Sequence, residues 1–89
     1  MPQEKLTIVN PLGLHARAAS KFVNLAKGFE ADVRLAKDGT EADGKSIMSV
    51  MLLAAPMGSE VELTVSGADE AEAFAALKGM ITDGFGELD

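Results

Sequence analysis

The segment ADVRLAKDGTEAD, residues 31–43, predicts a β-hairpin and therefore an antiparallel sheet. Apolar and polar residues alternate through its first half, as expected of a strand with one buried face. The apolar positions are Ala31, Val33 and Leu35. The Asp38-Gly39 dipeptide that follows is typical of a two-residue hairpin turn, so residues 40–43 should return antiparallel to the first strand.

Alternation on either side of the hairpin predicts two further strands of that sheet. Residues 5–9 place Leu6 and Ile8 on one side, and the Asn-Pro-Leu-Gly sequence that follows should end this strand. Residues 61–65 alternate Val, Leu and Val with Glu and Thr, and they form the clearest predicted strand of the chain.

Two longer segments have the periodicity of helices. In residues 16–27, apolar residues recur every three or four positions, and Gly28 supplies a C-terminal stop. These apolar residues are Ala19, Phe22, Val23 and Ala26. The last helix should begin at Asp69, a cap residue that is followed by Glu72 three positions later. Its apolar residues are Ala71, Phe74, Ala75, Leu77 and Ile81.

A short apolar stretch rich in Met, Leu and Ala predicts a third helix at residues 46–55. Ser46 is in position to cap its start, and Pro56 should end it. Met and Leu at helical spacing are usually core residues, so Leu52 and Leu53 are expected to be buried.

The predicted order of elements is βαββαβα within a single domain, residues 1–89. Each strand has one apolar side. The expected α+β architecture is therefore one four-stranded antiparallel sheet with the three helices packed on one face. The tail, residues 84–89, is expected to fray.

Composition excludes several classes of function. The absence of cysteine from the 89 residues excludes thiolate metal sites and thiol catalysis, and one histidine argues against a histidine-based metal site. The net charge of −6 argues against nucleic acid as a partner, because phosphate binding needs a basic surface. No apolar run approaches the roughly 20 residues that cross a bilayer. We expect a cytoplasmic monomer with no cofactor, no metal and no membrane insertion.

The distribution of charge is uneven. All 14 acidic residues lie outside residues 10–29 and 44–59. Those two segments carry half of the eight basic residues, namely Arg17, Lys21, Lys27 and Lys45. If the fold brings them together, they form a neutral-to-positive face suited to a bound anion or an acidic partner. The alternative is that the basic residues are clustered by chance.

The only histidine, His15, lies at the predicted start of the helix at residues 16–27. The backbone amides of Ala16 and Arg17 have no acceptor within the helix and carry part of the positive end of its dipole, which makes this position an anion site. A phosphoryl group on a ring nitrogen could bind these amides and the Arg17 guanidinium. The alternative is a histidine that merely occupies the first turn, beside a solvated arginine.

Two segments resemble signatures of HPr, the histidine-containing phosphocarrier family of the bacterial phosphotransferase system. GLHARAA, residues 13–19, is similar to its phosphorylation site, and KSIMSVMLLAA, residues 45–55, to the segment around its regulatory serine. The similarity extends over residues 6–81. The chain departs from many members at Ala18, where they have proline, and at Ser49, where they have glycine. The resemblance implies an open-faced sandwich with strand order 1-4-2-3 and three helices on one face.

The resemblance also implies the roles of individual residues. His15 would accept a phosphoryl group on Nδ1 from phospho-enzyme I and pass it to IIA domains of sugar permeases, with help from Arg17. Ser46 would be a phosphoserine made by HPr kinase/phosphorylase as well as a structural N-cap. An exposed surface beside His15 would dock partners through Lys45, Ile47, Met48 and Met51. Such a protein is a phosphoryl-transfer intermediate rather than a conventional enzyme.

Two alternatives remain open at this point. A nitrogen-related paralogue would use the same histidine chemistry but act chiefly as a regulator. A non-catalytic regulator would use the face around Ser46 and never load His15, although the intact His15 and Arg17 argue against it. A conventional enzyme is disfavoured, because the chain has no paired carboxylate motif, phosphate-cradling loop or nucleophile elbow.

Overall fold

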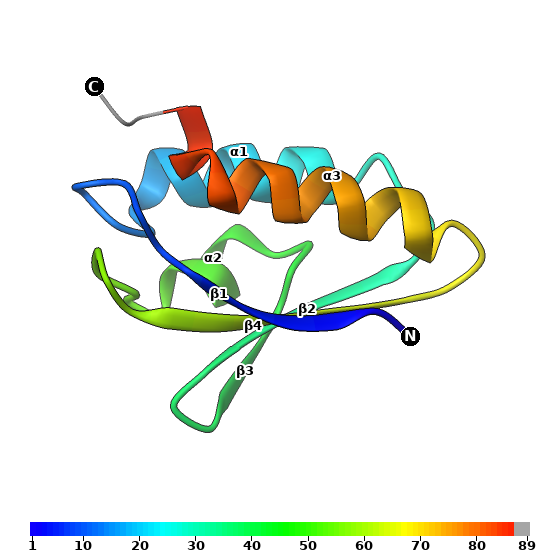
Figure 1. The fold of residues 1–89 in the computed structure, drawn as a ribbon, viewed down its shortest axis with the longest axis horizontal. Coiled ribbons are helices and arrows are strands. Elements are labelled where there is room, and N and C mark those ends of the chain that lie inside the picture. The colour runs from blue at the N-terminus through cyan, green and yellow to red at the C-terminus, as the bar shows by residue number, and fades with distance from the viewer. Residues whose placement is uncertain (87–89) are drawn as a thin grey trace.

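A computed structural model of the chain describes residues 1–86 and places four strands and three α-helices within them (Figure 1). The strands are β1 (Gln3–Thr7), β2 (Asp32–Lys37), β3 (Thr40–Asp43) and β4 (Glu60–Ser66). The helices are α1 (Ala16–Ala26), α2 (Ile47–Met51) and α3 (Glu70–Thr82), followed by a 3₁₀ turn, η1 (Gly84–Gly86). The order βαββαβα is the predicted one.

The strands form one antiparallel sheet in the order β1-β4-β2-β3. Leu63 at the centre of β4 pairs with Leu35 of β2, and Val61 pairs with Leu6 of β1. These side chains are buried beneath the helices, as their alternation predicts. The predicted α+β open-faced sandwich is therefore confirmed, although β1 begins and ends two residues earlier than its predicted span.

Within residues 1–86, no helix covers the other face of the sheet (Figure 1), and this face is charged. Alternate residues of the strands point to it, among them Lys5, Glu62 and Arg34. Arg34 forms an ion pair with Asp32 at 3.1 Å. The hydrogen bond and charge of Asp32 raise the pKa of the Arg34 guanidinium above its ordinary value. The sheet therefore divides the protein into a polar face and a covered apolar one.

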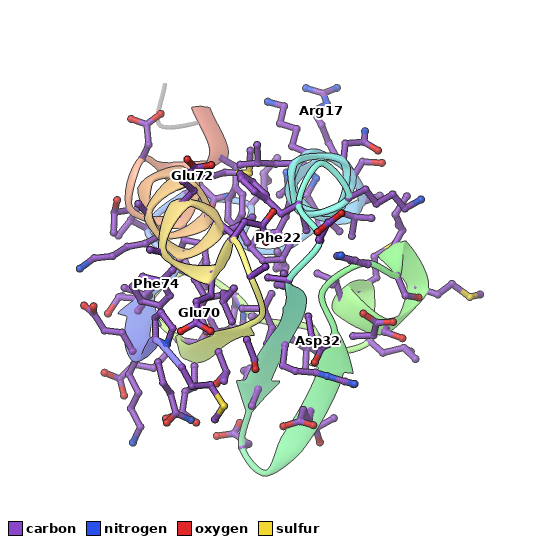
Figure 2. All side chains as sticks on the ribbon, turned by 90° about the vertical axis from the view of Figure 1, so that its right-hand side faces the viewer. Arg17, Phe22, Asp32, Glu70, Glu72 and Phe74 are labelled. Atoms are coloured by element: carbon purple, nitrogen blue, oxygen red, sulfur yellow. The ribbon has the colours of Figure 1, made fainter. Side chains whose placement is uncertain are left out.

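The core lies between the sheet and the layer formed by α1 and α3, which run side by side in Figure 1. α1 buries the predicted stripe together with Ala18, and Phe22 points between the two helices (Figure 2). α3 buries Ala73, Leu77 and Ile81. Ala71 and Ala75 are exposed, contrary to prediction, because the buried face of the helix follows Ala73, Leu77 and Ile81 at four-residue spacing.

Two predictions around α2 and α3 are wrong. α2 ends at Met51, so Leu52 lies in a turn with 79% of its surface exposed instead of in the core. Asp69 precedes α3 but makes no side-chain cap bond there. Its carboxylate accepts hydrogen bonds from the backbone N–H groups of Glu30 (2.9 Å) and Ala31 (2.8 Å) instead. These bonds, that to Glu30 first, lower the pKa of Asp69 below its ordinary value.

The chain after α3 is packed where the sequence predicts fraying. Phe85 adopts the left-handed conformation (φ 56°) and is 3% exposed, so it belongs to the core. Its carbonyl accepts a hydrogen bond from Lys21 Nζ at 3.1 Å, which fastens η1 to α1. Apolar burial therefore overrides the flexibility expected of a Gly-Phe-Gly sequence. The rest of the predicted frayed tail, residues 87–89, lies outside the described residues.

Candidate functional site

The loop between β1 and α1 holds His15 in place. It makes a turn in which the Gly13 N–H donates to the Asn10 carbonyl at 3.0 Å. Gly13 has φ +66°, and a Cβ built on it would lie 2.5 Å from the Ala55 carbonyl oxygen. Only glycine fits such a left-handed position against a neighbouring backbone. The Gly of the quoted signature is therefore required by the path of the chain.

A second loop, residues 52–59 between α2 and β4, supports the first one. The Leu14 N–H donates to the Ala55 carbonyl at 2.8 Å. Ile8 donates to the Ser59 carbonyl (2.8 Å) and accepts from the Gly58 N–H (2.7 Å). These three backbone bonds join the loop between α2 and β4 to both sides of the turn that precedes His15. The site is thus built on two loops and the first turn of α1.

His15 is the N-cap residue of α1 and is half-buried. Its Nδ1 accepts a hydrogen bond from the Arg17 backbone N–H at 3.2 Å. A ring nitrogen that accepts a hydrogen bond carries no proton, so this geometry suits the tautomer with its proton on Nε2. The structure therefore corrects one expectation: the Arg17 amide is not free in the resting protein, because the imidazole itself caps the helix.

The Arg17 side chain is exposed and points away from the core at the top of Figure 2. Lys21 follows one turn later on α1, and Lys27 lies at the C-cap. No acidic residue occupies the first turn of α1. The outer surface of α1 is thus basic, as the charge distribution predicts, although the Lys21 ammonium is also engaged by Phe85.

Ser46 caps α2 as predicted. It has an extended backbone, and its Oγ accepts a hydrogen bond from the Ser49 N–H at 3.3 Å. Ala55, which supports the His15 loop, lies beyond the opposite end of α2. Ser46 therefore lies at the start of α2, whereas the loop after α2 contacts the segment that precedes His15.

The predicted docking residues on α2 are accessible. Met48 is 75% exposed, Met51 41% and Ile47 36%. Lys45 lies elsewhere: its Nζ donates to the Phe29 carbonyl at 2.7 Å, near the end of α1 that is remote from His15. Leu12 and Leu52, which the sequence analysis did not select, are 75% and 79% exposed in the two loops that hold the site.

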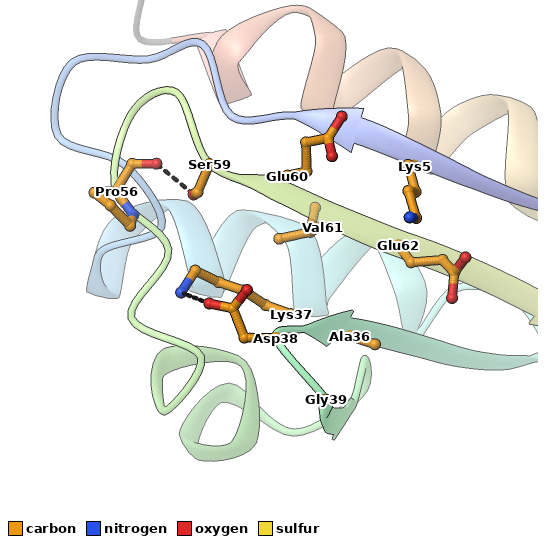
Figure 3. Close-up of a pocket in the computed structure, with 10 residues that line it drawn as sticks. All are labelled: Lys5, Ala36, Lys37, Asp38, Gly39, Pro56, Ser59, Glu60, Val61 and Glu62. Atoms are coloured by element: carbon orange, nitrogen blue, oxygen red, sulfur yellow. Dashed lines mark hydrogen bonds and ion pairs between the residues drawn. The ribbon is translucent and has the colours of Figure 1, made fainter.

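A hollow of the described chain has no His15 in its lining. It has a volume of about 630 Å³ and opens beside the β2–β3 hairpin (Figure 3). Its polar lining includes Lys5, Lys37, Asp38, Glu60 and Glu62. None of the predicted site residues line it. Across residues 1–86, no group of three or more acidic or histidine side chains is placed to hold a metal ion.

The described part of the chain also has no helix with the length and hydropathy needed to span a bilayer.

His15 at the start of α1, on an open-faced α+β sandwich, can be compared with known proteins. The family model described as the PTS HPr component phosphorylation site matches residues 2–83. The chain belongs to this HPr phosphocarrier family of the phosphotransferase system.

Individual relatives agree with this assignment. The phosphocarrier protein HPr of Cupriavidus necator is 49% identical over 87 residues, which cover 98% of each chain. The phosphocarrier protein NPr of Escherichia coli is 38% identical over 86 residues, 96% of each chain. A crystal structure of HPr from Thermoanaerobacter tengcongensis superposes with a TM-score of 0.93 at 40% identity and covers 98% of both chains.

Sequence reasoning missed one buried polar residue at the site. Asn10 is fully buried, and its Nδ2 donates to the Gly13 carbonyl at 2.8 Å. The Asn-Pro sequence predicts a turn, which the structure contains, but not that the asparagine side chain turns inward. The inward direction depends on packing against distant segments.

Proposed function

We propose that this protein carries a phosphoryl group on His15 Nδ1, accepting it from phospho-enzyme I and donating it to IIA domains of sugar permeases. The family membership of the chain supports the phosphocarrier activity. The observation that carries the choice of atom is the 3.2 Å hydrogen bond from the Arg17 N–H to Nδ1. This nitrogen holds a lone pair and is therefore the nucleophile of the ring.

The same hydrogen bond suggests how the phosphoryl group is stabilised. As the Nδ1–phosphorus bond forms, the bond from phosphorus to the donor breaks, and its electron pair leaves with the donor. Nδ1 then gives up the hydrogen bond from Arg17. The released Arg17 N–H and the Ala16 N–H, both in the first turn of α1, can donate to phosphoryl oxygens.

The Arg17 guanidinium supplies charge neutralisation in this proposal. It is exposed on the first turn of α1, two residues from His15. A charge-assisted bond from arginine to a phosphate oxygen is stronger than a neutral one. No metal is needed, because phosphoryl transfer depends mainly on in-line positioning and neutralisation of charge. Reversible transfer requires that this stabilisation stay moderate.

Partners dock on the surface of α2 in this proposal. Ile47, Met48 and Met51 present apolar area, and the basic residues Arg17 and Lys21 follow His15 in the first turns of α1. An apolar centre with a charged rim suits a protein partner that carries acidic groups. Lys45 joins this surface only if its ammonium leaves the Phe29 carbonyl.

The decisive experiment is labelling with phosphoenolpyruvate and enzyme I. The wild-type protein should acquire a phosphate that is labile in acid and stable in base, whereas His15→Ala should acquire none. Asn24→Ala, an exposed change on the same helix, serves as the matched control and should be labelled like the wild type. Labelling of His15→Ala would assign the phosphate to another residue.

A regulatory phosphorylation of Ser46 is the second part of the proposal. The hydroxyl is half-exposed at the start of α2, where the helix dipole tolerates added negative charge. The added charge would lie on the docking surface and repel acidic partners.

The test of this second part is incubation with ATP and an HPr kinase/phosphorylase. Acid-stable labelling should appear in the wild type and be lost in Ser46→Ala. The matched control is Ser49→Ala, which changes the neighbouring serine of the same helix. Equal labelling of wild type and Ser46→Ala would remove Ser46 as the modified residue.

The nitrogen-related branch is the alternative function, favoured by the match to E. coli NPr. It uses the same His15 chemistry and differs in its partners. A comparison of transfer rates to sugar-specific and nitrogen-related IIA domains separates the two. The expected monomeric state stays a prediction, since a T. tengcongensis HPr has also been solved as a dimer (40% identity, TM-score 0.78, 98% and 100% of the two chains).

A further inference from the structure

The strongest unexplained feature of the site is Asn10. It is the one buried polar or charged side chain among residues 1–86, and its surface is 0% exposed. Burial of an amide costs free energy unless the amide is hydrogen-bonded. The buried amide of Asn10 lies five residues before His15, in the loop that determines where His15 lies. A buried polar group in such a place indicates a positional requirement.

The hydrogen bonds of Asn10 lead directly to His15. Its Nδ2 donates to the Gly13 carbonyl at 2.8 Å, and its own carbonyl accepts from the Gly13 N–H at 3.0 Å. The Gly13 carbonyl also accepts from the His15 N–H at 3.0 Å. One carbonyl oxygen therefore receives both the Asn10 side chain and the His15 backbone. The Asn10 amide therefore fixes the direction of the Gly13 carbonyl, and this carbonyl in turn holds the His15 N–H.

The other neighbours of Gly13 leave little freedom for this peptide. Its left-handed backbone lies against the Ala55 carbonyl, and the next residue, Leu14, donates to the same carbonyl at 2.8 Å. These contacts hold the Gly13–Leu14 segment from one side, and Asn10 holds it from the other. Removal of the Asn10 amide would leave the Gly13 carbonyl free to turn and the His15 backbone free to follow.

We infer that Asn10 is a positioning residue for phosphoryl transfer: through the Gly13 carbonyl, it orients His15 so that Nδ1 faces the Arg17 N–H. The inference rests on the proposed use of His15 Nδ1. Asn10 touches neither the phosphoryl group nor the ring in this arrangement. Its effect is to fix the direction from which the phosphorus must approach Nδ1.

Two substitutions distinguish the role of the Asn10 hydrogen-bond donor from the role of its side-chain volume. Asn10→Ala removes the side-chain amide, whereas Asn10→Leu keeps most of its volume and cannot donate a hydrogen bond. Val65→Ala is the matched control for lost stability, because it truncates a buried residue at the far end of β4, where it pairs with Val33. All three proteins should be compared at a temperature at which each is folded.

The first measurement is the ¹⁵N spectrum of the imidazole ring in the unphosphorylated protein. The neutral wild-type ring should show the Nε2–H tautomer, and the Arg17 amide should show the signature of a hydrogen bond. Both Asn10 variants should shift toward a mixture of tautomers, and Val65→Ala should match the wild type. Ring signals in the Asn10 variants identical to those of the wild type would overturn the inference.

The second measurement is the rate of phosphoryl transfer from enzyme I. The Asn10 variants should lose about tenfold to a hundredfold, because small misplacements of a reacting atom are costly. The loss should fall mainly on kcat. An equal loss in Val65→Ala would assign the effect to stability and overturn the inference. If the wild type is not labelled at all, the proposed function fails, whereas the ring spectrum still decides the role of Asn10.

Discussion

The two ends of α1 satisfy their exposed backbone groups in different ways. At the start, the Arg17 N–H is held by His15 Nδ1 at 3.2 Å, a partner that chemistry can remove. Beyond the end, side chains from distant loops hold the backbone: Lys45 Nζ binds the Phe29 carbonyl at 2.7 Å, and Asp69 binds the next two N–H groups. The hydrogen bond at the start of α1 can be replaced by other bonds, whereas those beyond its end hold the helix to distant loops.

This difference indicates where the protein can lose a native hydrogen bond and stay folded. A phosphoryl group can replace the hydrogen bond at the start of α1 with hydrogen bonds of its own. The bonds beyond the other end connect α1 to the segments that precede α2 and α3, so their loss loosens three elements together. Substitutions at the two ends should therefore affect different quantities.

The largest effect is expected from Gly13→Ala, at the His15 end. The new Cβ would lie 2.5 Å from the Ala55 oxygen and 2.9 Å from Pro56 Cα, at a residue with φ +66°. Urea unfolding should show a loss of about 2–4 kcal/mol. Gly39→Ala is the control, because its φ is +83° and nothing lies within 4 Å of the new Cβ. Its cost should be about 1 kcal/mol. Equal costs would show that the approach to Ala55 is unimportant.

A smaller effect, dependent on pH, is expected from Asp69→Asn at the other end. The two backbone bonds hold the pKa of Asp69 below its ordinary value of 3.8. The Asp69 carboxylate therefore stabilises the folded protein fully above that value. This stabilisation is lost as the pH falls through the lower pKa that Asp69 has in the folded state. The melting temperature of the wild type should fall more steeply between about pH 4 and pH 2 than that of the variant.

The control for this experiment is Asp83→Asn, an exposed aspartate at the other end of α3. It should retain the acid sensitivity of the wild type. The interpretation fails if Asp69→Asn and the wild type show parallel melting curves over this pH range.

The smallest effect is expected from Lys45→Met, which keeps the apolar stem and removes the ammonium that binds Phe29. Denaturant titration should show a loss of about 1 kcal/mol, the usual net value of one hydrogen bond. Lys27→Met, at the exposed C-cap lysine of α1, should cost less. A cost at Lys45 no greater than at Lys27 would mean that the anchor contributes nothing measurable.

Most of the fold follows from local patterns in the sequence. Alternation identifies the strands, and Asp38-Gly39 identifies the hairpin that makes the sheet antiparallel. The apolar stripe of α1 predicts its buried face correctly. The errors lie where a local signal competes with distant packing. Leu52 is exposed because α2 stops early, and Phe85 is buried because η1 packs against α1 and α3.

The candidate site divides in the same way. His15, its position at the start of α1 and the cap at Ser46 follow from sequence. The bonds that position them do not, because Asn10, Lys45 and Asp69 each act on a carbonyl or amide whose location depends on the completed fold. An aspartate before a helix suggests a local cap, yet Asp69 binds a strand start 38 residues away in the chain.

The packed turn after α3 has a practical consequence for protein engineering. Phe85 closes the hydrophobic core, and Lys21 secures its carbonyl. An affinity tag fused after residue 89 keeps Phe85 in the chain. A shortened version that stops at Thr82 would lack Phe85 and would expose aliphatic side chains of α1 and α3 to water. Deletion libraries that trim the carboxyl terminus should therefore show an abrupt fall in recovered material once the aromatic ring is lost.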